Sequence, residues 1–129
     1  MKCYCNSGKE FNQCCQPIIT GHSKAETAEQ LMRSRYSAFV IADISYLLNS
    51  HQKTTRPTKD RKKILKWTKS VRWIGLEIIA TQKGSVSDMD GYVEFKAFFE
   101  ENGKKEFIHE NSCFIKENDI WYYKSGTHS

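Results

Sequence analysis

Four cysteines stand within the first fifteen residues of this 129-residue chain, as Cys3-Tyr-Cys5 and, after eight intervening residues, Cys14-Cys15. A segment this short buries too little apolar surface to form a core, so covalent or coordinate bonds must hold it together. Four thiolates so close in sequence form a tetrahedral ligand set for a soft divalent ion, for which zinc is the usual choice. We therefore expect one structural Zn²⁺ bound by Cys3, Cys5, Cys14 and Cys15.

Two disulfides are the alternative way to hold this segment. The chain opens at Met1-Lys2 with no apolar run of the kind that a secretion signal contains. We therefore expect a cytoplasmic protein, and cytoplasmic thiols stay reduced, which favours metal over disulfides. The longest apolar runs are only a few residues, so no transmembrane segment is expected.

The residues around the cysteines follow a specific pattern. It reads Cys3-x-Cys5-x-Ser7-Gly8-Lys9-x-Phe11-x-x-Cys14-Cys15. This pattern resembles the SEC-C motif, a zinc-binding segment also found at the C-terminus of the SecA translocation ATPase. That family usually has Gly where this chain has Asn6, which also adopts turn geometry, and often has His where this chain has Cys15. In SecA-like proteins the motif docks protein partners, so the resemblance implies a protein partner here too.

Three further segments extend the resemblance over nearly the whole chain. They are Glu29-x-Leu31-Met32-Arg33-Ser34-Arg35-Tyr36-Ser37-Ala38-Phe39, His109-Glu110-x-Ser112-x-Phe114 and Trp121-Tyr122-Tyr123-x-x-Gly126. Each is similar to a segment of the YchJ-like family of small bacterial proteins. The resemblance implies a body with the nuclear transport factor 2-like fold, a curved sheet wrapped by helices. It implies a fold and a metal rather than a reaction.

The length fits one small domain with an appended knuckle, which we place at residues 1–20 and 21–129. We expect the knuckle to add little to the core of the body. Ser23-Lys24-Ala25-Glu26 has the form of a capping box, so a helix is expected to begin near Lys24. Asp43 is a plausible N-cap for a second short helix. A third helix is expected from Asp60 to about Lys69.

The period of the apolar residues then changes from helical to alternating. One strand is expected through Ile74, Leu76, Ile78 and Ala80, and the next through Val93, Phe95, Ala97 and Phe99. Asn102-Gly103 is a strong hairpin signal. It leads into a third strand over residues 107–116, and a fourth follows over 120–124. Helices followed by an antiparallel meander predict an α+β fold, with three helices packed on a curved four-stranded antiparallel sheet.

Arg35 is the residue at which the first helix departs from its own pattern. It falls among Ala28, Leu31 and Ala38 on the apolar face, where an unpaired charge is costly. A structural ion pair to the sheet or a snorkelling side chain is one explanation, and a cation lining a pocket for an anionic ligand is the other. In either case we expect a carboxylate partner. The candidates are Glu77, Glu94 and Glu110.

The pocket hypothesis extends to other residues of the sheet and of the first helix. Its members are Arg35, Tyr36, Trp73, Glu94, His109 and Trp121. His109 and Glu110 are neighbours on a strand and point to opposite faces, so they cannot act together as an acid–base pair. A lone strand histidine is more often structural than catalytic.

The third helix and its flanks are strongly basic, with nine Lys and Arg in residues 53–72 against a net charge of +5 for the whole chain. The expected interaction face comprises Arg61, Lys62, Lys63, Lys66 and Lys69. A basic run of this kind is usually a solvated helix face, but it also creates a local positive field. Nucleic acid is a disfavoured partner, because aromatic residues are sparse there and no nucleic-acid motif is present.

Three functions remain, of different classes. The first, which we favour, is an interaction module whose zinc knuckle docks a protein. The second is a binder of a small anionic ligand, or an enzyme, using the cavity of the curved sheet. The third is a domain that acts through its basic face on nucleic acid or an acidic partner. A closed Cys₄ site leaves no free coordination position, so zinc catalysis is not expected.

Overall fold

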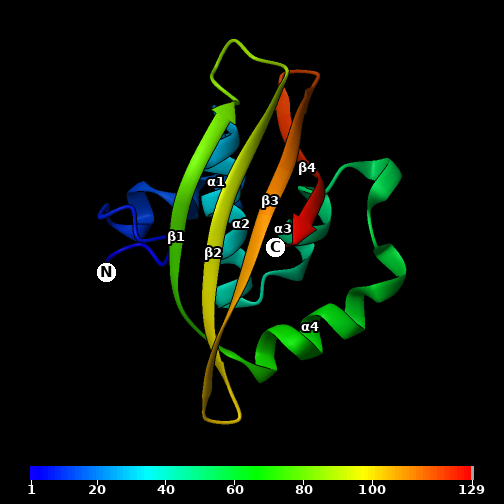
Figure 1. Cartoon of the computed structure of the whole chain (residues 1–129). Coiled ribbons are helices and arrows are strands. Elements are labelled where there is room, and N and C mark those ends of the chain that lie inside the picture. The colour runs from blue at the N-terminus through cyan, green and yellow to red at the C-terminus, as the bar shows by residue number, and fades with distance from the viewer. Residues whose placement is uncertain (129) are drawn as a thin grey trace.

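A four-stranded antiparallel sheet forms the second half of the chain (Figure 1). In the computed structural model, which describes residues 1–128, its strands follow one another in the order of the sequence. They are β1 (Arg72–Lys83), β2 (Asp90–Glu101), β3 (Lys104–Glu117) and β4 (Ile120–His128). Asn102 and Gly103 both have positive φ at the β2–β3 turn, which confirms the predicted hairpin.

The first half of the chain is helical. Its elements are η1 (Phe11–Gln13), α1 (Cys15–Ile19), α2 (Ala28–Ile41), α3 (Ile44–Asn49), η2 (Lys53–Thr55), η3 (Thr58–Asp60) and α4 (Arg61–Ser70). Helix α2 packs against one face of the sheet, and α4 lies at the end of the sheet where β1 begins (Figure 1). The α+β fold with three body helices on a four-stranded sheet is therefore as predicted. No helix in the described part of the chain is long and apolar enough to cross a membrane.

Helix α2 begins four residues later than predicted. Its N-cap is Thr27, whose Oγ1 accepts from the backbone N–H of Gln30, while the Gln30 side chain accepts from the N–H of Glu26. The working capping box is therefore Thr27 to Gln30, and not the one that starts at Ser23. By contrast Asp43 caps α3 as predicted, because its carboxylate accepts from the N–H of Tyr46.

Strand β1 does not alternate as predicted, because its pairing with β2 shifts register twice. One shift falls between Trp73 and Gly75 and the other between Ile78 and Ala80. Each bulge adds a residue and changes which side chains share a face. Trp73 therefore lies on the inner face with Leu76, while Ile74 is exposed.

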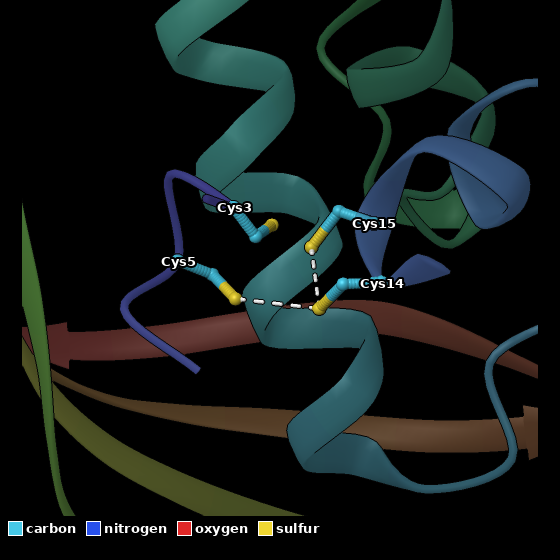
Figure 2. A group of neighbouring side chains, drawn as sticks. All are labelled: Cys3, Cys5, Cys14 and Cys15. Carbon is cyan, nitrogen blue, oxygen red and sulfur yellow. Dashed lines mark hydrogen bonds between the residues drawn. The ribbon is translucent and has the colours of Figure 1, made fainter. Parts of the chain in front are cut away.

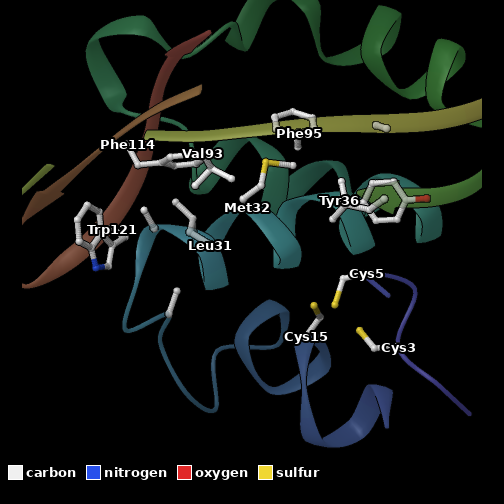
Figure 3. Close-up of a cluster of buried hydrophobic side chains, with 14 residues drawn as sticks. Cys3, Cys5, Cys15, Leu31, Met32, Tyr36, Val93, Phe95, Phe114 and Trp121 are labelled. Carbon is white, nitrogen blue, oxygen red and sulfur yellow. The ribbon is translucent and has the colours of Figure 1, made fainter. Parts of the chain in front are cut away.

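The larger of two core clusters joins the sheet, α2 and the N-terminal segment (Figure 3), and the smaller one packs the end of α2 against α3. Helix α2 lies between the sheet on one side and the cysteines on the other. Cys3, Cys5 and Cys15 are buried in the same cluster as Leu31 and Phe114. The knuckle is therefore a part of the main core, contrary to the expectation that it adds little to it.

Candidate metal centre and cavity

The four N-terminal cysteines converge on one point beside α2 (Figure 2). All four Sγ atoms lie within 4.8 Å of one another, with 3.7 Å between Cys5 and Cys14 and 3.9 Å between Cys14 and Cys15. A tetrahedral ion with Zn–S bonds of ~2.3 Å requires sulfurs about 3.8 Å apart. A disulfide would require about 2.05 Å, and all four cysteines are free. The donor set therefore fits a metal ion.

Turn residues in the knuckle bring the two cysteine pairs together. Asn6 and Gly8 have φ of 63° and 85°, which reverse the chain after the first pair. The N–H of Cys3 then bonds to the carbonyl of Lys9 at 2.8 Å. Asn6 thus performs the turn that Gly performs in the motif. Its side-chain amide also donates to the carbonyl of Leu76, which ties the knuckle to β1.

Polar groups surround the sulfurs and offset their negative charge. The hydroxyls of Ser7 and Ser37 lie 3.2 Å from Cys14 Sγ and 3.6 Å from Cys3 Sγ. Arg33 pairs with Glu29 at 2.9 Å and also donates to the Cys5 carbonyl at 2.6 Å. Such contacts hold thiolates in place and tune them for a metal.

The thiols already interact strongly with one another. Hydrogen bonds from the Cys15 thiol, and then from that of Cys3, hold the pKa of Cys5 far below its usual value. Hydrogen bonds to Cys3 and Cys5 raise the pKa of Cys15, and burial raises the pKa of Cys14, so the four thiols share their protons unequally. A metal needs thiolates rather than thiols, so binding of an ion here would release the remaining protons.

A cavity of about 550 Å³ opens between the sheet, α2, α3 and α4. Its volume is within the range of about 300–1,000 Å³ that small-molecule sites occupy. Aromatic side chains form a large apolar part of the wall. They include Tyr36, Phe39, Trp67, Trp73, Phe95 and Tyr123.

Arg35 is at the polar end of this cavity, and it is only 8% exposed. Its Nη1 donates to the carbonyl of Leu47 at 2.8 Å and to the hydroxyl of Ser50 at 2.6 Å. Its guanidinium lies 4.7 Å from the centre of the Tyr123 ring. Within residues 1–128 no carboxylate forms an ion pair with it. The predicted direct carboxylate partner is therefore wrong.

Glu110 lies near Arg35 but is occupied by other groups. Its Oε2 accepts from the hydroxyls of Ser112 and Tyr123, and its Oε1 lies 3.0 Å from Nε2 of His128. Tyr123 thus stands between the two charges, with its ring under the guanidinium and its hydroxyl on the carboxylate. These residues come from the helix and the two strand segments on which the resemblance rested.

Three of the six proposed pocket residues, Arg35, Tyr36 and Trp73, line the cavity, while the other three do not. Glu94 and His109 lie on the outer face of the sheet, where they contact each other at 2.6 Å. Strand alternation decides this, because Glu110, the neighbour of His109, takes the inner position. Trp121 is buried in the main core, and its indole N–H donates to the Glu26 carbonyl.

The cavity also includes residues that the sequence did not indicate. His51 follows α3, and burial, aided by Arg35 and Arg56, lowers its pKa to about 4. A single histidine in a loop belongs to no periodic pattern, so the sequence gives no indication that His51 lines a cavity. Trp67 is half-buried on α4, and with Ile64 it forms the α4 side of the cavity.

The basic residues of α4, apart from Lys63, do not line this cavity. Arg61, Lys62, Lys63, Lys66 and Lys69 are all exposed, and Lys63 alone among them also reaches the cavity mouth. The arrangement is that of an amphipathic helix with a charged outer face. A partner for this face stays a prediction.

Comparison with known proteins identifies the family of this chain. A family model described as the YchJ middle NTF2-like domain matches residues 27–126. The chain belongs to the YchJ-like family. A UPF0225 protein of Geobacter sulfurreducens is 42% identical over 96% of the chain and 77% of its own length. A UPF0225 protein of Vibrio cholerae is 36% identical over 98% of the chain and 82% of its own length.

Two solved structures of SEC-C motif containing proteins are similar over both parts of the chain. One, from Rhodopseudomonas palustris, has a TM-score of 0.90 at 30% identity and covers 100% of this chain and 99% of its own. The other, from Psychrobacter arcticus, has a TM-score of 0.82 at 33% identity and covers 98% and 81%. The YchJ-like assignment and the SEC-C character of the knuckle are thereby confirmed.

Proposed function

We propose that this YchJ-like chain binds one zinc ion through Cys3, Cys5, Cys14 and Cys15, and that the knuckle so fixed docks a protein partner. The observation that carries the first part is the convergence of four free cysteine sulfurs within 4.8 Å. Four sulfur ligands complete a tetrahedron, so the ion is structural and leaves no position for a substrate. We further propose that the protein works in the cytoplasm, where such thiols stay reduced.

A groove beside the metal site supports the docking role. It has a volume of about 530 Å³ and runs between the knuckle and the first turns of α2. Its lining is mostly polar and carries both signs of charge, with Lys9, Gln13, Lys24, Glu29, Gln30 and Arg33 among its residues. A concave surface with charged and amide groups suits a polar peptide segment, since hydrogen bonds and charges then fix its register.

The docking role is tested by comparing partners captured by matched variants of the zinc-loaded chain. Lys9→Glu with Gln13→Ala changes two exposed groove residues, and Lys62→Glu with Lys66→Glu changes the outer face of α4 to the same extent or more. We expect the specific partner to be lost with the groove variant and kept with the α4 variant. Retention with the groove variant would contradict docking at the knuckle, and loss with the α4 variant alone would favour the basic face.

Binding of a small anionic ligand in the cavity is the second candidate function. The observation that favours it is a buried guanidinium at the end of an aromatic cavity, with no carboxylate paired to it within residues 1–128. Buried polar groups in such concave sites are the usual means of orienting a ligand.

A further inference from the structure

We propose that the cavity binds a small amphipathic monocarboxylate, with its carboxylate on Arg35 and its apolar body against the aromatic wall. This inference rests on the second candidate function, small-molecule binding in the cavity, and is independent of docking at the knuckle. It adds the chemical class of the ligand and its orientation.

The first step is the unused edge of the Arg35 guanidinium. Both recorded hydrogen bonds of this side chain leave from Nη1. Among residues 1–128 no group accepts from Nε or Nη2, neither atom is fully buried, and the side chain lines the cavity. Nε and Nη2 point in parallel from one side of the guanidinium plane. That edge matches the two oxygens of a carboxylate, which is the geometry of a bidentate pair.

The second step is the charge. Burial lowers the pKa of Arg35 to about 10, so the guanidinium remains a cation at neutral pH. Its protein partners are neutral: a carbonyl, a hydroxyl and the Tyr123 ring. A buried charge without a counter-ion is costly, and a ligand that supplies one recovers that cost. Glu110 is not the counter-ion of Arg35, because its carboxylate accepts hydrogen bonds from the hydroxyls of Ser112 and Tyr123.

The third step is the apolar wall. Trp73 is at its centre, edge-to-face with Trp67 at 5.3 Å and with Tyr36 at 5.9 Å between ring centres. Ala97 and Ile108 continue the surface along the sheet. A flat or aliphatic body of several carbons removes this surface from water, whereas an inorganic anion covers none of it.

The fourth step limits the ligand to a single negative charge at the Arg35 end, where the Glu110 carboxylate is buried. A second negative group at this end would meet Glu110 without a second buried cation to balance it. Asp60 and Lys63 both line the cavity nearer its mouth, and their opposite charges offset each other there. His51, which also lines this end, has a lowered pKa and is neutral at pH 7, so it offers a hydrogen bond rather than charge.

The test uses the zinc-loaded full chain and three acids with their uncharged counterparts. The probes are indole-3-acetate, 4-phenylbutyrate and octanoate, each paired with the matching primary alcohol, together with inorganic phosphate. Binding is measured by ¹H–¹⁵N NMR of the indole N–H groups, since the chain has three tryptophans and only Trp67 and Trp73 line the cavity. We expect at least one acid to saturate the protein, to shift these two signals and not that of Trp121, and to bind about tenfold or more tightly than its alcohol.

Variants assign the two ends of the ligand. Arg35→Gln should reduce the affinity for the acid to that of the alcohol, and Trp67→Ala should weaken acid and alcohol alike. Lys62→Gln, on the exposed face of α4, is the matched control for Trp67→Ala. It should leave the affinities for the acid and for the alcohol unchanged. Trp67→Ala lies on a half-buried helix face and keeps the test available if Arg35→Gln does not fold.

The outcomes separate this inference from the function on which it rests. Equal affinity for acid and alcohol would overturn the carboxylate class while leaving a small-molecule cavity in place. Absence of saturable binding by every probe would overturn both. Saturable binding of phosphate in preference to the acids would replace the amphipathic ligand with an inorganic anion.

Discussion

Gly126 has no side chain, and this leaves room for the buried Glu110 carboxylate. It pairs with Ser112 across β3 and β4, and a Cβ at this position would overlap the carboxylate and approach the Tyr123 hydroxyl to 2.8 Å. The polar end of the cavity therefore depends on a glycine whose backbone conformation other residues could also adopt. The sequence marked the position only through its resemblance to a family segment.

Gly126→Ala is expected to destabilise the domain by about 1–3 kcal/mol, because the new methyl group displaces a carboxylate that three side chains hold. Alanine otherwise favours a strand over glycine, so without this overlap the change would be neutral or stabilising. Urea unfolding gives the free energy, with Ser125→Ala on the same strand as control. Equal stability of the two variants would show that Glu110 moves freely.

His51 predicts a pH dependence of stability. Its folded pKa of about 4 is below the ordinary 6.5, because burial and the charges of Arg35 and Arg56 oppose protonation. The unfolded chain therefore takes up a proton first, and the stability present above pH 6.5 is lost as the pH falls toward 4. By this linkage His51→Gln should remove about 2 kcal/mol of the stability difference between pH 7 and pH 5. Urea unfolding of both proteins at pH 7 and pH 5 measures this difference. An equal loss of unfolding free energy between the two pH values in wild type and variant would contradict the role given to His51.

At the scale of elements, α2 is shared by both sites. Ser37 and Arg33 face the cysteines, while Arg35 and Tyr36 face the cavity. The knuckle also contributes three buried cysteines to the main core. The metal should therefore stabilise the body as well as the first twenty residues.

Removal of the metal is expected to lower the melting temperature of the whole domain by several degrees or more, because a loss of even 1 kcal/mol shifts a domain of this size by about 2–8 °C. Circular dichroism with and without a chelator, under reducing conditions, follows the sheet. The Trp73 indole N–H reports the cavity in the same samples. Unchanged melting of the sheet, with order lost only in residues 1–20, would mean that the knuckle is an independent module after all.

The elements that were predicted well are those set by local pattern and local chemistry. Asp43, the Asn102-Gly103 turn and the alternation of β2 required no knowledge of distant residues. The start of α2 was a local error, because Thr27 caps the helix instead of Ser23. The other errors came from tertiary structure. Two bulges in β1 changed its inner face, and pairing with β3 placed Glu94 beside His109 on the outside of the sheet.

The two sites also differ in how far the sequence predicts them. Ligand spacing within one short segment indicates the cysteine cluster, because all four cysteines lie in thirteen residues. The cavity draws on three helices, all four strands and the segment between α3 and α4, and its residues carry no common spacing. Arg35 could be singled out because a charge on an apolar face is anomalous. Its neutral partners at Leu47 and Ser50 could not be foreseen, since backbone carbonyls have no sequence signature.

At the scale of the whole molecule, we propose that a metal ion joins the N-terminal segment to the body. Zinc analysis of protein purified without chelator under reducing conditions, combined with X-ray absorption at the zinc edge, tests it most directly. We predict one zinc per chain and a first shell of four sulfurs at ~2.3 Å. Metal-free protein with Cys3, Cys5, Cys14 and Cys15 joined in two disulfides, or a first shell containing nitrogen or oxygen, would contradict it.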